Sequence, residues 1–423
     1  MEVNLTSTNI FYIIRSMKNE HLKNYDNIVG VLHKEIMKSK NPTYEHMFNR
    51  ICAYVFAVGP SEIIRHDYKV NDVDWFVWES PRWKIVGNSN LDYNYFFSKF
   101  DGFTCRFGKE LEDDPTYCPL GPEIADIEIG AGMCPKVNGK NCAFCYKSNG
   151  GNIAYNMKFD EFKKLVDFMP KNLSQIAFGI TGVYSNPDFF KIMEYAKSIG
   201  ISPNYTTNGV DLDDAAIDKT LDLCGRIAVS CYEGAKEICY NTIKRVGEKA
   251  KERNKKFPCN MHIVISKDTY NHVMDVLDDV KNGKVENLGA IVFLRIKPVG
   301  RAKCLDCQIP KSMYEEIVKF CLDNKITFGF DSCGAKQVEN VLTDMGKSEL
   351  TTCIEPCEAV KFSSYFSYKC LFSSCSFCET NPNIRHDLDP FQFPTFTEFW
   401  NSMDDLRFPK KCACESCPYY NLD

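Results

Sequence analysis

From residue 124 onward, short apolar segments alternate with longer amphipathic ones. Six of the short segments are predicted to be β-strands: 124–130, 175–181, 203–207, 226–232, 258–266 and 290–298. The segments between them show the spacing of apolar residues that is typical of helices: 160–169, 187–199, 213–223, 235–254 and 268–281. Such alternation indicates parallel β/α units. Because their crossovers are short and right-handed, we expect an open barrel whose functional loops follow the carboxyl ends of the strands.

The composition is that of an ordinary globular protein. The 423 residues carry a net charge of -5, which argues against a nucleic-acid partner. No apolar run has the length of a membrane span, and the first residues are neither basic nor followed by an apolar core, so we expect a cytoplasmic protein without a membrane partner. The densest basic segment, 244–256, reads as a solvated helix face with ion pairs between positions i and i+4.

Twenty-two cysteines in a reducing compartment favour metal or iron-sulfur ligation over disulfides. Cys134, Cys142 and Cys145 follow the first predicted strand. Three thiolates can hold three irons of a 4Fe-4S cluster, which leaves the fourth iron free to bind a small molecule. The segment 137–140 can loop outward as a turn without moving the thiols. A zinc site is the alternative, with its fourth ligand supplied from a distant part of the chain.

The end of this loop, Cys142-Ala-Phe144-Cys145, resembles the C-x3-C-x-aromatic-C loop of the radical S-adenosylmethionine (SAM) superfamily, although the first gap has seven residues instead of three. The resemblance implies an α/β fold whose core is a partial (β/α)6 barrel. The chain has Gly179-Ile-Thr-Gly182 where the family has the glycine-rich turn that holds the SAM amino group, but it lacks the acidic residue of that turn. Residues 204–209 resemble the family's TNG motif, and 228–231 resemble its fourth strand.

The residues that this resemblance offers for SAM binding are Phe144, Gly179, Thr181, Gly182, Thr207, Asn208 and Ser230. Side chains of a strand alternate between its two faces. His262 therefore shares a face of the fifth strand with Asn260, and Arg295 shares a face of the sixth with Lys297. If these faces line the barrel, the four residues are available to SAM or substrate, and we include His262 among the SAM contacts. Otherwise they are partnered core groups.

The cysteine-rich end of the chain resembles the SPASM and twitch extensions of the same superfamily, which hold one or two auxiliary 4Fe-4S clusters. Cys357 and Cys375 have the span of the family's opening element, but Cys370 occupies its glycine position. The later element of four cysteines is not reproduced, and a compact Cys412-x-Cys414-x2-Cys417 group remains. The resemblance implies one auxiliary cluster with ligands drawn from Cys357, Cys375, Cys412, Cys414 and Cys417. Zinc is the alternative here too.

We expect four parts in the chain. An N-terminal α+β region spans residues 1–95, an extended connector 96–122, the barrel 123–332, and a small Cys-rich domain 333–423. Trp75, Trp78 and Trp83 lie close together in the first part, where they form either the core of a small domain or a surface that docks a substrate or peptide.

By resemblance, the reduced cluster cleaves SAM to a 5'-deoxyadenosyl radical that abstracts hydrogen from a substrate, with a flavodoxin or ferredoxin as electron donor. The favoured substrate is a peptide or protein side chain, because SPASM-like architectures resemble peptide maturases. One alternative is a radical SAM enzyme that acts on a small molecule or nucleotide. Another is a non-catalytic, zinc-stabilised binding protein.

Overall fold

The computed structural model describes residues 62–109, 113, 115–379, 381 and 385–407. The chain divides into two compact units. Of the described residues, unit 1 comprises those from 62 to 123 together with Met169–Ser174, and unit 2 comprises Ile124–Phe168 and those from 175 to 407.

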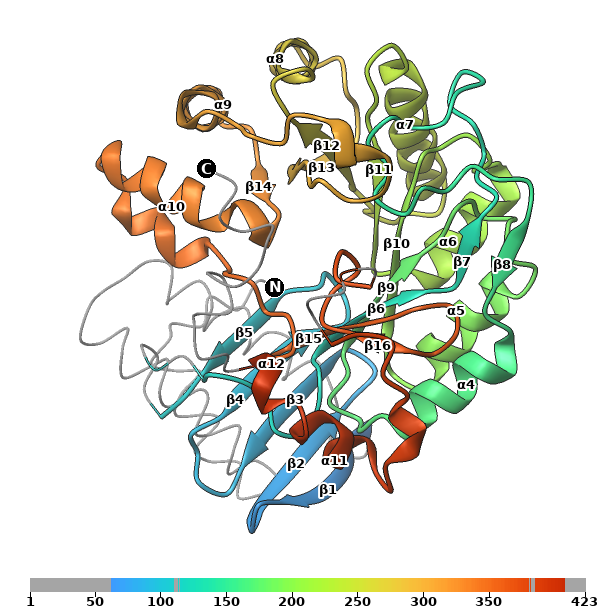
Figure 1. Cartoon of the computed structure of the whole chain (residues 1–423), viewed down its shortest axis with the longest axis vertical. Coiled ribbons are helices and arrows are strands. Elements are labelled where there is room, and N and C mark those ends of the chain that lie inside the picture. Colours follow the sequence, from blue (N-terminus) through green and yellow to red (C-terminus); the bar gives the residue numbers. More distant parts are fainter. Residues whose placement is uncertain (1–61, 110–112, 114, 380, 382–384, 408–423) are drawn as a thin grey trace, which may run out of the picture. The chain divides into compact units, whose positions relative to one another are not determined.

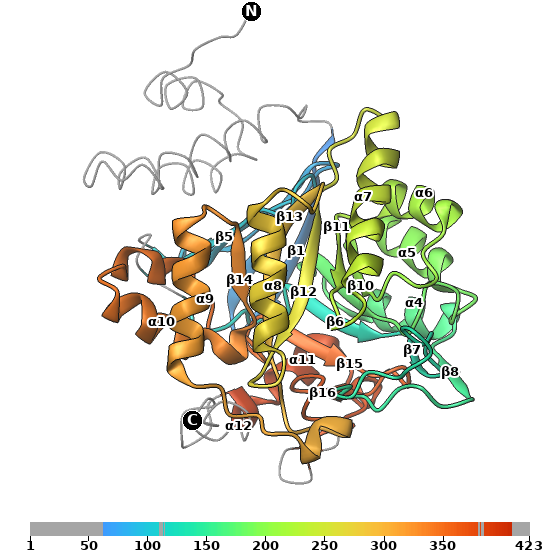
Figure 2. The same cartoon turned by 90° about the horizontal axis from the view of Figure 1, so that it is seen from above.

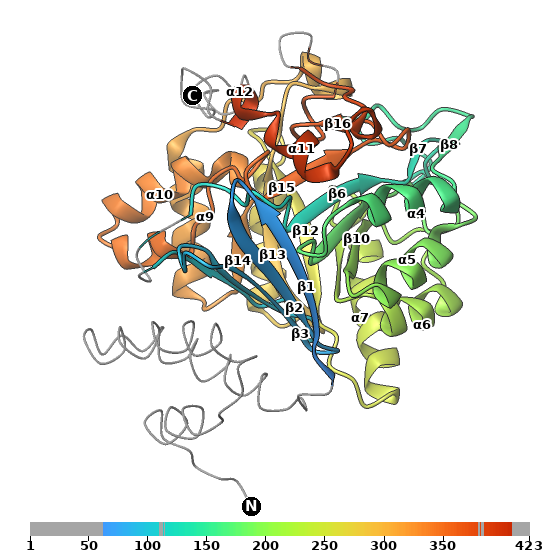
Figure 3. The ribbon, with the colours of Figure 1, turned by 90° about the horizontal axis from the view of Figure 1, so that it is seen from below.

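Unit 1 contains a five-stranded antiparallel sheet in which each strand pairs with the next along the chain (Figure 3). Its strands are β1 (Ile64–Val70), β2 (Val73–Glu79), β3 (Trp83–Asn88), β4 (Asn94–Ser98) and β5 (Thr104–Phe107). Trp75, Trp78 and Trp83 are all buried and form part of the core. β4 and β5 extend the sheet into the range 96–122, where a connector was expected, because Phe96 and Phe107 are also buried in the core.

Lys84 is a buried cation within unit 1. Its ammonium group donates a 2.5 Å hydrogen bond to the carbonyl of Leu173, and burial lowers its pKa to about 7. Between pH 7 and the ordinary lysine pKa, the unfolded chain therefore binds more protons than the folded one, so the free energy of unfolding must rise with pH across this window.

We expect the free energy of unfolding of the wild type to rise by roughly 1 to 3 kcal/mol more than that of Lys84→Met between pH 7 and 10. Denaturant titrations at several pH values measure the free energy of unfolding of both proteins. In the difference between them, the contributions of the titrating groups that both proteins share cancel. Parallel curves for the two proteins would show that Lys84 keeps an ordinary pKa.

Unit 2 is built on a nine-stranded sheet in the order β14-β13-β12-β11-β10-β9-β6-β15-β16. The six predicted strands are its centre: β6 (Ile124–Glu128), β9 (Gln175–Gly179), β10 (Ser202–Thr207), β11 (Arg226–Ser230), β12 (Cys259–Ile265) and β13 (Leu288–Arg295). All neighbouring pairs among them are parallel. The predicted fold class is therefore confirmed.

Helices follow one another along the outside of this sheet (Figures 1 and 2). The five predicted helices are α4 (Phe159–Phe168), α5 (Phe189–Ser198), α6 (Asp214–Leu223), α7 (Lys236–Glu252) and α8 (Tyr270–Lys281). Their apolar stripes are buried, as Phe162, Leu165 and Val166 of α4 illustrate. No helix in the described part of the chain is long and apolar enough to cross a bilayer.

The sheet extends beyond the six predicted strands at both edges. On one side, β14 (Phe328–Phe330) pairs in parallel with β13 and is preceded by α9 (Lys311–Asp323). On the other side, β15 (Ser363–Phe366) pairs in parallel with β6 and antiparallel with β16 (Phe372–Ser373). The remaining helices of this part are α10 (Ala335–Asp344), α11 (Phe396–Asn401) and α12 (Asp404–Arg407). The pairing of β15 with β6 brings the cysteine-rich segment to the strand that precedes the loop of Cys134, Cys142 and Cys145, called the cluster loop below.

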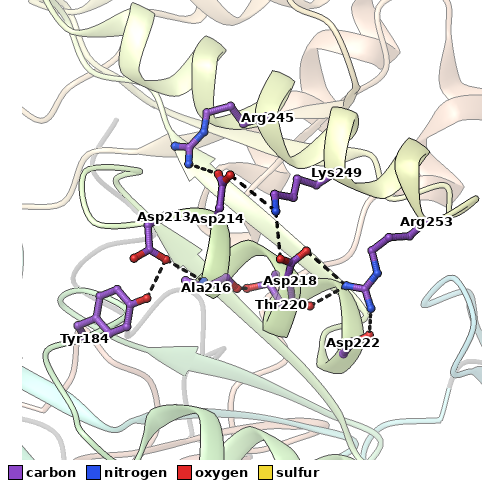
Figure 4. Close-up of polar contacts among 10 residues, drawn as sticks. All are labelled: Tyr184, Asp213, Asp214, Ala216, Asp218, Thr220, Asp222, Arg245, Lys249 and Arg253. Carbon is purple, nitrogen blue, oxygen red and sulfur yellow. Dashed lines mark hydrogen bonds and ion pairs between the residues drawn. The ribbon is translucent and has the colours of Figure 1, made fainter.

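The basic segment 244–256 is structural, but its ion pairs differ from those predicted. Its cations lie opposite the carboxylates of α6, so the pairs cross from helix to helix instead of forming within one helix (Figure 4). The pairs are Arg245 with Asp214, Lys249 with Asp218, and Arg253 with Asp222. The three cations and the three carboxylates each recur every four residues along their helices, so the two rows of charge lie opposite each other.

Candidate active site

The three cysteines lie on a loop that a small two-stranded sheet closes at its base. β7 (Gly130–Gly132) pairs with β8 (Ala154–Asn156), and the loop runs between them. The Asn149 side chain accepts a 2.8 Å hydrogen bond from the amide of Gly132, which narrows the base of the loop. The loop therefore starts and ends at the carboxyl end of β6, where the sequence predicted a functional loop.

The seven-residue gap after Cys134 contains a two-residue turn. Val137 and Lys140 exchange backbone hydrogen bonds of 3.1 and 3.0 Å. Asn138 and Gly139 between them have φ values of 47° and 73°, which Asn and Gly adopt more readily than other residues. The predicted turn is thus present, and the Asn138 side chain ties it to the carbonyl of Gly234.

The segment after β13 holds the cluster loop from the other side. The Arg301 side chain donates a 2.8 Å hydrogen bond to the carbonyl of Cys142, and its backbone amide donates to the carbonyl of Cys145 at 3.1 Å. Gly300 permits this approach: its φ is 61°, and a Cβ there would lie 2.2 Å from the Tyr146 carbonyl oxygen. Arg301 is a positioning residue whose role the sequence did not reveal.

The three thiols line one cavity of about 340 Å³. Burial raises the pKa of the Cys134 thiol to about 11, and the neighbouring charges of Cys142 and Cys145 act in the same direction. All three cysteines therefore face the same space, and the Cys134 sulfur lies 3.4 Å from the carbonyl oxygen of Thr181 on the neighbouring wall. A bound cation or cluster is needed to hold them together as thiolates.

Most of the SAM-binding candidates line the same cavity: Gly179, Thr181, Thr207, Asn208 and Ser230. They come from the carboxyl ends of β9, β10 and β11. Asn208 is already partly engaged, since its side chain donates a 3.0 Å hydrogen bond to the Pro135 carbonyl of the cluster loop. Gly182 lies beside the cavity, where a Cβ would come within 2.4 Å of the Asp211 carboxylate and 2.8 Å of Pro135.

Phe144 and His262 lie outside the set of described residues that line the cavity. The Phe144 ring stacks on Tyr232 at 6.0 Å and packs behind the loop against Ile296 and Ala302. The His262 ring lies 3.4 Å from the Thr206 hydroxyl, and burial lowers its pKa to about 4, so it is neutral at pH 7. Tyr232, which does line the cavity, was not predicted as a site residue.

The residues present fit a three-thiolate cluster with bound SAM. The Thr181 hydroxyl is buried at the cavity wall without a hydrogen-bond partner in the described part of the chain, which is costly unless a ligand supplies one. Thr207 and Ser230 add hydroxyl groups on the neighbouring strands. Thiolates on one wall and hydrogen-bonding groups on the next suit an iron-sulfur centre and a polar ligand.

A charged network forms another part of the cavity wall. Lys147 donates to the Tyr365 hydroxyl at 2.5 Å, lies 3.1 Å from the Glu128 carboxylate and pairs with Glu379. Tyr365 in turn donates to Glu128 at 3.1 Å. The network joins β6, the cluster loop and β15, so it ties the cysteine-rich segment to the loop. The sequence did not reveal these residues, because three of the four contacts join positions more than 200 apart.

A second group of thiols lies in the cysteine-rich segment. Cys375 and Cys378 have their sulfur atoms 3.4 Å apart. Burial raises the pKa of Cys333 to about 12, and the charges of Cys357 and Cys375 act on it in the same direction. The structure thus brings the predicted Cys375 into contact with Cys378, which was not predicted. Cys333, also not predicted, lies two residues after Asp331, and the pairing of Lys297 with Asp331 and its contact with the Phe377 ring bring these two segments together. Cys412, Cys414 and Cys417 lie outside the described residues.

A buried ion pair lies beside this second group. Lys297 pairs with Asp331, and its ammonium lies 4.4 Å from the centre of the Phe377 ring. Arg295 is buried as well. Within the described ranges, no three His, Cys, Asp or Glu side chains are placed to bind one metal ion.

No protein-family model matches the sequence, and no curated protein matches it. Solved structures do match. SuiB of Streptococcus suis bound to its precursor peptide SuiA superposes with a TM-score of 0.52 and 12% identity over 72% of this chain and 71% of that chain. SuiB bound to SAM gives the same TM-score and identity over 72% of each chain. At this identity the likeness concerns the fold alone: the protein described here shares the fold of SuiB, a mixed α/β fold built on parallel β/α units.

Proposed function

We propose that this protein is a radical SAM enzyme that modifies a peptide or protein side chain. One observation supports the chemistry above all: Cys134, Cys142 and Cys145 line a single cavity with Thr181, Thr207, Asn208 and Ser230. When bound, a 4Fe-4S cluster with one open iron and SAM supplies a 5'-deoxyadenosyl radical. An electron donor such as a flavodoxin or ferredoxin belongs to the same proposal.

The chain's own residues contribute binding, orientation and exclusion of water. The three thiolates hold the cluster at the carboxyl end of β6, and Arg301 fixes the two loop carbonyls beside them. The backbone from Gly179 to Thr181, together with Ser230, offers hydrogen bonds to SAM. Gly182 allows close packing beside this wall. A barrel interior that keeps water away protects a reactive radical from side reactions.

The peptide substrate is supported by the fold comparison, because the structure of SuiB similar to this chain holds a precursor peptide. A small-molecule substrate remains the second candidate. A short peptide encoded beside this protein and modified by it would favour the first. A modified metabolite, with no effect of any such peptide on SAM cleavage, would favour the second.

We further propose one auxiliary 4Fe-4S cluster, held by Cys333, Cys357, Cys375 and Cys378. This set adds Cys333 and Cys378 to the predicted Cys357 and Cys375, because the sulfur atoms of Cys375 and Cys378 lie 3.4 Å apart and Lys297 joins their segment to that of Cys333. The predicted ligands Cys412, Cys414 and Cys417 lie outside the described residues and stay predictions. Replacing Cys333 by alanine is expected to lower the iron content by about four per chain and leave the first cluster in place. Iron and sulfide analysis of the reconstituted proteins measures this. Unchanged iron in Cys333→Ala would remove Cys333 from the ligand set.

The experiment that tests the enzymatic proposal is anaerobic reconstitution with iron and sulfide, followed by dithionite and SAM. Formation of 5'-deoxyadenosine is expected. A colourless protein that contains zinc and leaves SAM intact would instead indicate a zinc-stabilised binding protein.

A further inference from the structure

Three charged side chains line the cavity that contains the thiols: Asp126, Glu128 and Lys147. Glu128 and Lys147 neutralise each other, and Glu379 provides a second carboxylate for Lys147. The Asp126 carboxylate has no hydrogen bond or ion pair with any described residue, and burial is the one cause that acts on its pKa. The cavity therefore contains one carboxylate that no protein cation compensates.

Asp126 lies in the middle of β6, where it neighbours Ala177 of β9 and Tyr365 of β15. Its side chain is open to the cavity, although protein surrounds it closely enough to raise its pKa to about 6. An unpaired carboxylate that faces an enclosed cavity attracts positive charge, because low-dielectric walls strengthen its field. A ligand with a positively charged group could pair with it there.

The position of Asp126 separates it from the groups assigned to SAM. Gly179, Thr207 and Ser230 each stand at the carboxyl end of their strand, whereas Asp126 comes two residues before the end of β6. Two residues of a strand correspond to about 7 Å. Asp126 therefore reaches a deeper part of the barrel than the proposed SAM contacts do.

We propose that Asp126 binds a positively charged group of the substrate, a protonated amine or a guanidinium. The inference rests on the proposed function, since it assigns the carboxylate to the substrate of that reaction. For a peptide substrate, a lysine or arginine side chain or a free amino group fits this description. Because SAM also carries positive charge, the test must distinguish SAM from the substrate.

The test uses the full chain loaded with iron-sulfur clusters and SAM, titrated with n-butylguanidinium chloride in a calorimeter. n-Butanol is the neutral probe, and sodium chloride holds the ionic strength constant. We expect Asp126→Asn to weaken binding of n-butylguanidinium at least tenfold, roughly the loss seen when one partner of a buried charge pair is removed. Asp268→Asn, which changes an exposed carboxylate, should bind as the wild type does. Equal binding by wild type and Asp126→Asn, or no preference of the wild type for the cation over n-butanol, would overturn the proposal.

Two further measurements show whether a weaker cation affinity of Asp126→Asn reflects a lost substrate contact, a lost SAM contact or a loss of folding. The dissociation constant of SAM should be the same in wild type and Asp126→Asn, whereas a tenfold weaker affinity for SAM in the variant would assign Asp126 to SAM and overturn the proposal. The melting temperature of Asp126→Asn should equal or exceed that of the wild type, because an uncompensated charge is removed, and Asp126→Ser provides a second variant if the first does not fold. Cation binding can be measured without turnover, so the two proposals can fail separately. A protein that cleaves SAM but does not bind the cation keeps the proposed function and loses this inference. A protein that binds the cation through Asp126 but does not cleave SAM loses the proposed function.

Discussion

Replacing Cys142 by alanine is expected to abolish cleavage of SAM, with a loss of at least about 100-fold in 5'-deoxyadenosine formation. The cavity offers three thiols from one loop, and removing one leaves two ligands for a cluster that needs three. Cys134→Ala and Cys145→Ala should behave in the same way. Iron content, visible absorbance and 5'-deoxyadenosine are measured on the same preparations.

Cys321 provides the matched control. It is fully buried on α9 and lies away from both thiol groups in sequence, so Cys321→Ala removes a core sulfur without touching a proposed ligand. We expect this variant to lose about 1 kcal/mol of stability and to retain its iron and its cleavage of SAM. If Cys142→Ala keeps both iron and cleavage as well, the assignment of the cluster to this loop is wrong.

Replacing Gly300 by alanine is expected to have the second largest effect. The added Cβ would lie 2.2 Å from the Tyr146 carbonyl oxygen and 2.6 Å from that of Cys145, and both are backbone atoms of the cluster loop. The two segments must then separate, which breaks the hydrogen bonds from Arg301. We expect the free energy of unfolding to fall by about 2 to 4 kcal/mol and the retained iron to fall with it.

Gly283 separates two causes of the expected loss, which are the clash with the cluster loop and the strain of positive φ at a residue other than glycine. Its φ is 73°, close to that of Gly300, but nothing lies within 4 Å of a Cβ built there. Gly283→Ala therefore introduces the backbone strain alone, about 1 to 2 kcal/mol, and should leave the iron content unchanged. Thermal unfolding and iron analysis of both variants measure the difference. Equal losses of stability and iron in the two variants would show that the contact with the cluster loop is unimportant.

The parts of the fold that the sequence predicted are those with a local signal. The strand at 124–128 and the helix at 159–168 are each recognisable from the period of their own apolar residues. The turn at Asn138 and Gly139 was predictable for the same reason, since both residue types tolerate positive φ. The three cysteines of the loop were found because they lie within twelve consecutive positions.

The parts that were missed depend on contacts between distant segments. No local pattern indicates that β15 pairs with β6, and that pairing brings Tyr365 to Glu128. Likewise, Cys333 follows β14 while Cys375 follows β16, and only the three-dimensional arrangement brings their segments together through the contacts of Lys297 with Asp331 and Phe377. The role of Arg301 was missed because its hydrogen bonds reach back about 160 positions along the chain.

The claim on which the account depends is that one iron at the Cys134, Cys142 and Cys145 loop has no ligand from the protein. Mössbauer spectroscopy of the protein reconstituted with ⁵⁷Fe, recorded before and after addition of SAM, tests it most directly. With Cys333→Ala used to remove the auxiliary cluster, one iron in four should differ from the rest and should change its isomer shift when SAM binds. Four equivalent irons that ignore SAM, or a protein without iron, would contradict the account.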